Sequence, residues 1–294
     1  MRTNYQIYLL VLPTLIYFVL FKYAPMYGLQ MAFRNYNPAL GITQSPWAGL
    51  KYFSRILSRP YFYQVIVNTL SISLSSLILG FPLPVIFALA LNEMKNAKLK
   101  KTIQTITYAP HFISTVVVAA MLKIFLSPTS GIVNQLIKLC GGDAVNFMMR
   151  PECFVPIYVI SGIWQGLGWS AIIYVAALAS VDPALHESAM IDGATRLQRM
   201  VHINLPCILP TVIIMLILRT GSLLNVGFEK VFLLSNDAVL EKSEVISTYT
   251  YRIGITNSQF SQSTAIGLFN SVIQFVILIS VNAISRKVSE TSLW

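Results

Sequence analysis

The chain has 294 residues, of which 55% are hydrophobic and only 11% are charged. Soluble domains carry about twice that charged fraction, so the composition excludes an ordinary soluble protein and indicates a membrane protein. The net charge of +10 does not indicate nucleic-acid binding, because the basic residues are scattered at the ends of apolar runs. They form no basic stripe with interleaved aromatic residues.

Charge-free apolar runs define the predicted membrane spans. Each run reaches the roughly 17–25 residues that an α-helix needs to cross a bilayer. We therefore expect an all-α polytopic membrane protein, with a single transmembrane domain over residues 1–294. The six predicted spans cover about 5–28, 64–91, 103–126, 154–181, 207–226 and 264–284. The first run is too long for a signal peptide, and no small-residue cleavage site follows it.

The segments between the spans indicate the orientation of the chain. Residues 29–62 are rich in aromatic and turn residues, which suits an external loop on the membrane surface. The short turn 92–101 holds four lysines and is the clearest cytoplasmic signal. Residues 127–152 and 227–262 are then external, and both termini are cytoplasmic.

The polar segment 182–206, between the fourth and fifth spans, is predicted to form two short helices joined by a turn. Asp182 and Pro183 suit the cap and first position of a helix. Asp192-Gly193 provides a turn, since glycine adopts the left-handed conformation that ends helices. Thr195 can cap the second helix, and Leu205-Pro206 ends it and starts the next span. By physics alone, this segment is as readily an ordinary surface loop as a docking element.

The same segment resembles the signature loop of binding-protein-dependent ABC importer permeases. The shared pattern is E-(A/S)-A-x-x-D-G-A followed by I-x-L-P. It is carried here by Glu187, Ser188, Ala189, Asp192, Gly193, Ala194, Ile203, Leu205 and Pro206. Ser188 replaces the usual second alanine and Met200 a common aromatic residue; both departures are conservative.

Further segments resemble the carbohydrate branch of this family, most closely permeases for alginate-like or other polysaccharide-derived oligosaccharides. They are YLLVLPTLIYFVLFKYAPMYGLQMAFRNY, NTLSISLSSLILGFPLPVIFALALNE, YAPHFIS, GFEKVFLLSN, ISTYTYRIGI and the closing SLW. The resemblance covers essentially the whole chain and implies the type I importer permease fold with six transmembrane helices. It does not specify the sugar.

The resemblance also implies how the chain works. Segment 182–206 would be the coupling helix that sits in a groove of an ATPase subunit, with Glu187 in polar contact there or simply solvated. Because the chain has no G-x-x-x-x-G-K-[ST] phosphate loop, ATP and Mg would bind to separate ATPase subunits, and this chain would be neither an enzyme nor bind a cofactor.

The implied complex contains two ATPase subunits, a second and usually different permease, and an external solute-binding protein. The implied location is the bacterial cytoplasmic (inner) membrane, in contact with lipid and not with nucleic acid. ATP binding would rock the spans between inward-open and outward-open states.

A sugar path needs aromatic faces and hydrogen-bonding side chains that face a cavity. The candidate path residues in the spans are Asn68, Trp164, Gln165, Trp169, Arg219, Asn225, Asn270 and Gln274. For each of them, helix–helix hydrogen bonding or packing is the alternative interpretation.

Three cations, Lys22, Lys123 and Arg219, lie in or beside apolar stretches, whereas no span interior holds Asp or Glu. Charged groups inside spans are costly and tend to mark substrate paths, so unpaired cations favour an acidic oligosaccharide. Snorkelling at span ends is the better explanation for Lys22 and Lys123. Arg219 is therefore the remaining candidate for a cation that binds an acidic substrate.

The cysteines and histidines indicate no further chemistry. Three cysteines without a CxxC motif define neither a disulfide framework nor a metal site, although Cys140 and Cys153 could pair outside the cell. His111, His186 and His202 show no ligand spacing. The rival interpretations are a secondary transporter, which would need embedded carboxylates, and a membrane assembly protein without transport activity.

Overall fold

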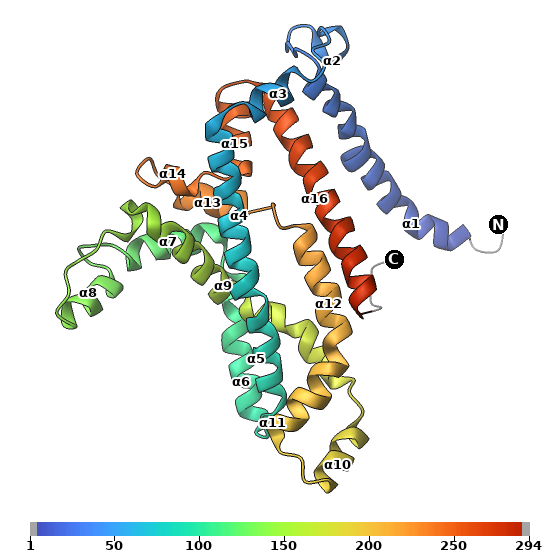
Figure 1. Ribbon diagram of the computed structural model, residues 1–294, viewed down its shortest axis with the longest axis vertical. Helices are drawn as coiled ribbons and strands as arrows, with labels where there is room; N and C mark the ends of the chain where they lie inside the picture. Colours follow the sequence, from blue (N-terminus) through green and yellow to red (C-terminus); the bar gives the residue numbers. More distant parts are fainter. Residues whose placement is uncertain (1–4, 290–294) are drawn as a thin grey trace. The chain divides into compact units, whose positions relative to one another are not determined.

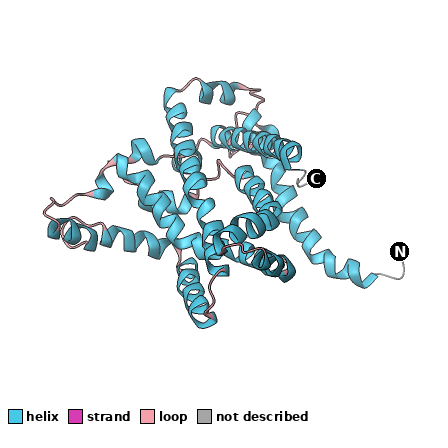
Figure 2. Ribbon diagram, turned by 60° about the horizontal axis from the view of Figure 1, so that its bottom comes forward, coloured by secondary structure: helices cyan, strands magenta, loops and turns pink. Residues whose placement is uncertain are grey.

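The computed structural model describes residues 5–289, and these residues form helices joined by loops (Figure 2). Within this range, β-structure is confined to two isolated bridges, Arg34–Trp47 and Asn37–Gly41. The chain divides into two compact units. The closing segment 292–294 and both chain ends lie outside the described residues.

Unit 1 combines residues up to Tyr63 with Tyr249–Val272. Its elements are α1 (Tyr5–Phe18), the π-helix η2 (Val19–Tyr23), the 3-10 helix η3 (Ala24–Phe33), α2 (Gly41–Gln44), α3 (Lys51–Leu57), the start of α4 (Pro60–Gly80), the end of α15 (Ile246–Tyr251), the π-helix η7 (Arg252–Thr256) and the first half of α16 (Phe260–Ser289).

The region expected to be an external loop, residues 29–62, is ordered by local contacts within unit 1. The Arg34 guanidinium donates to the carbonyls of Thr43 and Ser45, each at 2.9 Å. The Ser261 hydroxyl of α16 donates to the Arg34 carbonyl at 2.7 Å. These bonds satisfy backbone groups that an irregular segment would otherwise leave unpaired.

Unit 2 holds the other helices (Figure 1). After the rest of α4 come α5 (Pro82–Asn92), α6 (Ala97–Tyr108), the 3-10 helix η4 (Ala109–Phe112), α7 (Thr115–Phe125), α8 (Ile132–Leu139), the 3-10 helix η5 (Phe147–Met149), α9 (Pro151–Ala179), α10 (Pro183–Ile191), α11 (Arg196–Arg199), the π-helix η6 (Met200–Asn204), α12 (Leu205–Gly221), α13 (Phe228–Leu234), α14 (Leu240–Ser243), the start of α15 and the end of α16.

The core of unit 2 is built around α9, the longest helix in that unit. One cluster joins Ala88 of α5, Ala171 of α9 and Ile208 of α12. Helices α6 and α9 also meet closely at Gly168, where an added Cβ would lie 2.3 Å from the Thr107 carbonyl oxygen. Small residues at such crossings are typical of membrane helices, because their packing depends on close backbone approach.

Five helices of the described chain are long and apolar enough to cross a membrane, and a sixth span results if one bent pair is counted as a single crossing. Large apolar side chains such as Ile78, Ile86 and Ile160 are more than half exposed. Such exposure suits contact with lipid rather than water.

The segment expected to form the third span, about 103–126, is bent. It consists of two helices, Ala97–Phe112 and Thr115–Phe125, which are bent by 98° relative to one another. Pro110 lacks a backbone N–H, and Ile113 is extended. The Ser114 hydroxyl then accepts from the Val117 N–H and caps a new helix.

Candidate functional site

The segment 182–206 has the capped helix–turn–helix structure that its sequence indicates. The Asp182 carboxylate accepts from the Ala184 N–H at 2.9 Å and caps α10. Gly193 has a φ of +77°, and nothing would lie within 4 Å of an added Cβ there. Glycine is therefore needed for backbone conformation and not for space. Thr195 and Gln198 form a reciprocal capping box at α11.

The expectation that Leu205-Pro206 separates the second short helix from the fifth span is wrong. The helical run continues from Arg196 to Gly221, through the π-turn η6 into α12. Pro206 lies at the start of α12, directly after the π-turn η6. The loop is therefore joined to the span by continuous helix.

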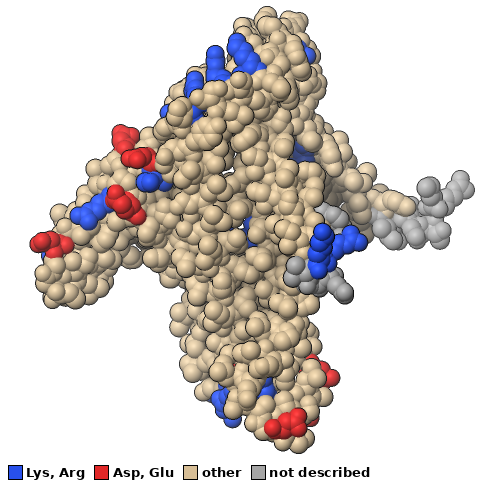
Figure 3. Space-filling model, viewed as in Figure 1, with Lys and Arg blue, Asp and Glu red and all other residues tan. Residues whose placement is uncertain are grey.

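This coupling loop, defined as residues 182–206, exposes apolar side chains at one end of unit 2. Leu185, Met190, Ile191 and Leu197 are exposed, Ile191 by 87%. Charged side chains gather at the same end, whereas the visible face of the helices above it is almost free of charge (Figure 3). A mixed apolar and charged surface on capped helices is suited to docking a protein.

The signature residues are mostly accessible. Glu187, Ser188, Asp192, Gly193 and Pro206 are exposed, and Ala189, Ala194, Ile203 and Leu205 are half-buried.

The buried anchor of the loop is Asn204, which the sequence patterns did not single out. Its side chain is fully buried, and its Nδ2 donates to Glu93 Oε1 at 3.3 Å. Glu93 caps the end of α5 and lies within the lysine-rich turn 92–101. The coupling loop and the lysine turn therefore lie at the same end of unit 2.

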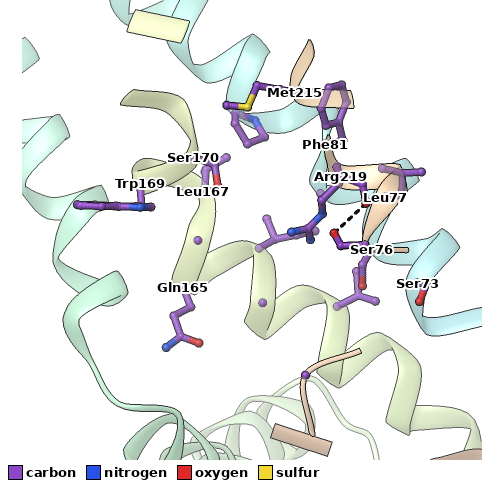
Figure 4. Close-up of a pocket in the computed structure, with 18 of the residues that line it drawn as sticks. Ser73, Ser76, Leu77, Phe81, Gln165, Leu167, Trp169, Ser170, Met215 and Arg219 are labelled. Carbon is purple, nitrogen blue, oxygen red and sulfur yellow. Dashed lines mark hydrogen bonds between the residues drawn. The ribbon is translucent and has the colours of Figure 1, made fainter. Parts of the chain in front are cut away.

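A cavity of about 1030 Å³ lies within unit 2, between α4, α5, α9, α12 and α13. Four predicted path residues line it: Gln165, Trp169, Arg219 and Asn225. Figure 4 shows Arg219 projecting from α12 between α9, which carries Gln165 and Trp169, and α4. The hydroxyls of Ser73, Ser76, Ser170 and Ser222 add hydrogen-bonding groups.

The other four predicted path residues do not line this cavity. Asn68 is buried, and its Nδ2 donates to the carbonyls of Glu241 and Glu244. These bonds correspond to the alternative interpretation, in which the residue connects helices instead of facing a substrate path. Trp164 is exposed. Asn270 belongs to unit 1, and Gln274 lies on α16 outside the lining.

Two lining residues also support the broken third span. Gln165 Nε2 donates to the Ile113 carbonyl at 2.8 Å, at the point where the helix is interrupted. The Trp169 ring stacks on His111, with centroids 4.3 Å apart. The break is therefore tolerated because α9 supplies the partners that the interrupted helix lacks.

The cavity is positively charged. Its lining contains Arg219 and Lys230, and no Asp or Glu is among the described residues that line it. Lys230 was not predicted, because it falls in segment 227–262, which we expected to be an external loop. The sequence signal that could have identified Lys230 is its helical spacing with apolar residues, because Lys230, Val231 and Leu234 form the buried face of α13.

The cysteines and acidic groups add no second site. Cys140, Cys153 and Cys207 are free thiols, of which Cys140 and Cys207 are exposed. Within residues 5–289, no three His, Cys, Asp or Glu side chains lie close enough together to hold a metal ion.

Known proteins resemble this chain over nearly its full length. The polygalacturonan/rhamnogalacturonan transport system permease protein YteP of Bacillus subtilis (strain 168) is 43% identical over 98% of this chain and 90% of that protein. Protein LplB of the same organism is 41% identical over 100% and 92%. A subunit of a bacterial alginate ABC transporter, crystallised with an alginate pentasaccharide-bound periplasmic protein, matches with a TM-score of 0.92 and 42% identity, over 99% and 98%.

The family model described as "Binding-protein-dependent transport system inner membrane component" matches residues 80–290. This range includes the coupling loop, the cavity helices α9 and α12, and Lys230. The fold is that of an ABC importer permease, and the chain belongs to the family of binding-protein-dependent transport system inner membrane components.

Proposed function

We propose that this chain is the permease subunit of an ATP-driven importer that moves an acidic oligosaccharide across the bacterial cytoplasmic membrane by alternating access. The observation that carries the proposal is the cavity of unit 2, which has two cationic lining residues and no acidic one among those described. A continuous helix connects this cavity to an exposed docking loop.

The lining suits a carboxylate-bearing sugar. Serine hydroxyls and amides can bond to sugar hydroxyls, and Trp169 offers an aromatic face. Cations buried in a low-dielectric site are costly when unpaired, so a substrate carboxylate would stabilise them. Relatives named for polygalacturonan/rhamnogalacturonan and alginate support this substrate class, because polygalacturonan and alginate are polyuronates.

The coupling loop suits a partner that delivers mechanical force. Its capped helices and exposed apolar side chains would dock into a groove of the ATPase subunit. On α12, Leu205 and Arg219 are about 21 Å apart at 1.5 Å per residue. A displacement of the loop would therefore move Arg219 with it, as in rigid-element coupling.

The proposed complex contains two ATPase subunits that bind ATP and Mg, a second permease and an external solute-binding protein. The coupling loop and the lysine turn would face the cytoplasm, together with both termini. Glu187 would make a polar contact with the ATPase, because it is exposed on α10. The cavity would then receive substrate from the binding protein on the opposite side.

The experiment is reconstitution of the complex in proteoliposomes with its ATPase and binding protein. We expect uptake of trigalacturonate only when ATP and the binding protein are both present, and co-purification of the ATPase with the permease. Uptake driven by an ion gradient without ATP would indicate a secondary transporter. Failure to co-purify an ATPase would exclude the importer complex.

A further inference from the structure

Lys230 lies in an unusual place for a lysine. It is only 8% exposed, on the short helix α13, which belongs to none of the candidate spans. Lysine is almost never fully buried unless it is paired. The lysine nevertheless shares the buried face of α13 with Val231 and Leu234.

The ammonium of Lys230 is only partly satisfied. Nζ donates to the Tyr158 carbonyl at 3.0 Å and lies 4.8 Å from the centre of the Tyr158 ring. This is its one hydrogen bond within residues 5–289. An ammonium carries three donors, so two remain for a ligand.

The structure leaves space next to the ammonium. Gly162, one helical turn after Tyr158 on α9, lines the cavity, and an added Cβ there would lie 3.4 Å from Nζ. A side chain at this position would start in van der Waals contact with the ammonium. Glycine therefore keeps Lys230 accessible to a molecule in the cavity.

Arg219 brings a second cation to the same cavity. It lines the cavity from α12 (Figure 4). Its guanidinium makes no hydrogen bond or ion pair within the described part of the chain. Two cations therefore line one cavity, whose described lining contains no carboxylate.

We infer that Lys230 and Arg219 together form a carboxylate-binding site in the cavity, and that Lys230 is a specificity-determining residue for charged over neutral saccharides. The inference rests on the proposed function and assigns a residue pair to it. A carboxylate accepts from both cations, whereas a neutral sugar hydroxyl would leave the buried ammonium uncompensated.

The electrostatics agree with this geometry. Burial lowers the pKa of Lys230 to about 8, because the charged form loses its hydration in the cavity. An anionic ligand would stabilise the charged form of Lys230, and the charged ammonium would in turn bind the ligand more tightly.

The test measures equilibrium binding of trigalacturonate, and of its neutral methyl ester, to the permease–ATPase complex in nanodiscs without the binding protein. We expect Lys230→Gln to lower the ratio of acid to ester affinity about tenfold, the typical contribution of a hydrogen bond to a charged group. Lys230→Arg should keep most of the ratio. The matched control is Lys242→Gln, because Lys242 is an exposed lysine on α14 outside the lining; the control should leave the ratio unchanged.

A structural role would give a different result. Lys230→Gln would then weaken both ligands equally, or lower the melting temperature of the complex without changing the ratio, and either result overturns the inference. If Lys230→Gln does not assemble, the ratio of acid to ester affinity is measured in the other two variants. Lys230→Arg should keep most of this ratio and Gly162→Ala should lower it; the opposite results overturn the inference. Wild-type complex that imports trigalacturonate but shows no preference for acid over ester also overturns it. Absence of any ATP-dependent uptake overturns the proposed function instead.

Discussion

The coupling loop and the cavity differ in how their functional residues are brought together. The loop gathers its groups within one stretch, from Asp182 to Pro206, through caps and one left-handed glycine. The cavity gathers Ser76, Gln165, Arg219 and Lys230 from four separate helices. The loop is therefore sensitive to local backbone changes, and the cavity is sensitive to charge. The loop should control the rate for every substrate, and the cavity should discriminate among substrates.

The largest expected effect comes from backbone strain introduced into the coupling loop, which leaves the charges of the cavity unchanged. Gly193→Val forces a β-branched residue into a φ of +77°, which costs about 1–2 kcal/mol locally and changes the shape of the loop. We expect uptake to fall about tenfold or more for acidic and neutral substrates alike, and ATPase stimulation by the binding protein to be lost.

The matched control is Gly141→Val, after α8. Gly141 has a φ of +84° and also has nothing within 4 Å of an added Cβ, so the strain is the same outside the loop. Similar loss of coupling in both variants would mean that strain anywhere disables the complex.

The second effect removes charge from the cavity. Arg219→Gln should lower uptake of trigalacturonate about tenfold while the complex still assembles, because one charged hydrogen bond to the carboxylate is lost. Arg196→Gln on α11 is the comparison, since an exposed arginine of the loop should change uptake of acid and ester in the same proportion. Unchanged acid uptake in Arg219→Gln would remove this residue from the path.

The third effect is a pH dependence that only the cavity should show. The titratable lining groups are Tyr158, Tyr174, Arg219 and Lys230. Arginine stays charged and tyrosine stays neutral near pH 8. Because the pKa of Lys230 is about 8, the ammonium is charged below this pH and neutral above it. Preference for acid over ester, measured by nanodisc binding, should fall toward the Lys230→Gln value, by up to about tenfold, as pH rises through about 8.

Lys230→Arg provides the check on this pH dependence. It should show a flat preference across the same range, since the guanidinium does not titrate there. A fall of equal size in Lys230→Arg would assign the titration to another group.

The smallest effect tests the space beside the ammonium. Gly162→Ala places a Cβ 3.4 Å from Lys230 Nζ, the end of a flexible side chain that can shift, so we expect a roughly two- to threefold loss of affinity for trigalacturonate, less than typical core overpacking. Gly166→Ala, one turn along the same helix and also in the lining, meets nothing within 4 Å. Equal effects in the two variants would show that the gap at Gly162 has no role.

The same contrast explains what could be predicted from the sequence. The caps of the coupling loop were predictable, because Asp182, Gly193 and Thr195 act on their own neighbours. The bend in the third span also had local signals, Pro110 and Ser114, but the absence of charge over the run indicated only that a span lies there. The continuity of helix through Pro206 was missed, since proline usually marks a start and a π-turn leaves no clear sequence signal.

The cavity was only partly predictable. Arg219 was identified because a charged group inside a span is costly and tends to mark a substrate path, and Trp169 because a sugar path needs aromatic faces. Asn68 met the same criterion but is satisfied by carbonyls near α14, which no local pattern indicates. Lys230 required the tertiary structure, because α13 is too short to be called a span and still packs inside the unit.

The most direct test of the central claim is the rate of ATP-dependent uptake of trigalacturonate and of its methyl ester by the complete reconstituted importer. We predict uptake that needs both ATP and the binding protein, with the acid preferred about tenfold or more at pH 7. Equal uptake of acid and ester would contradict the role of the cationic cavity. Uptake without ATP would contradict the role of the coupling loop.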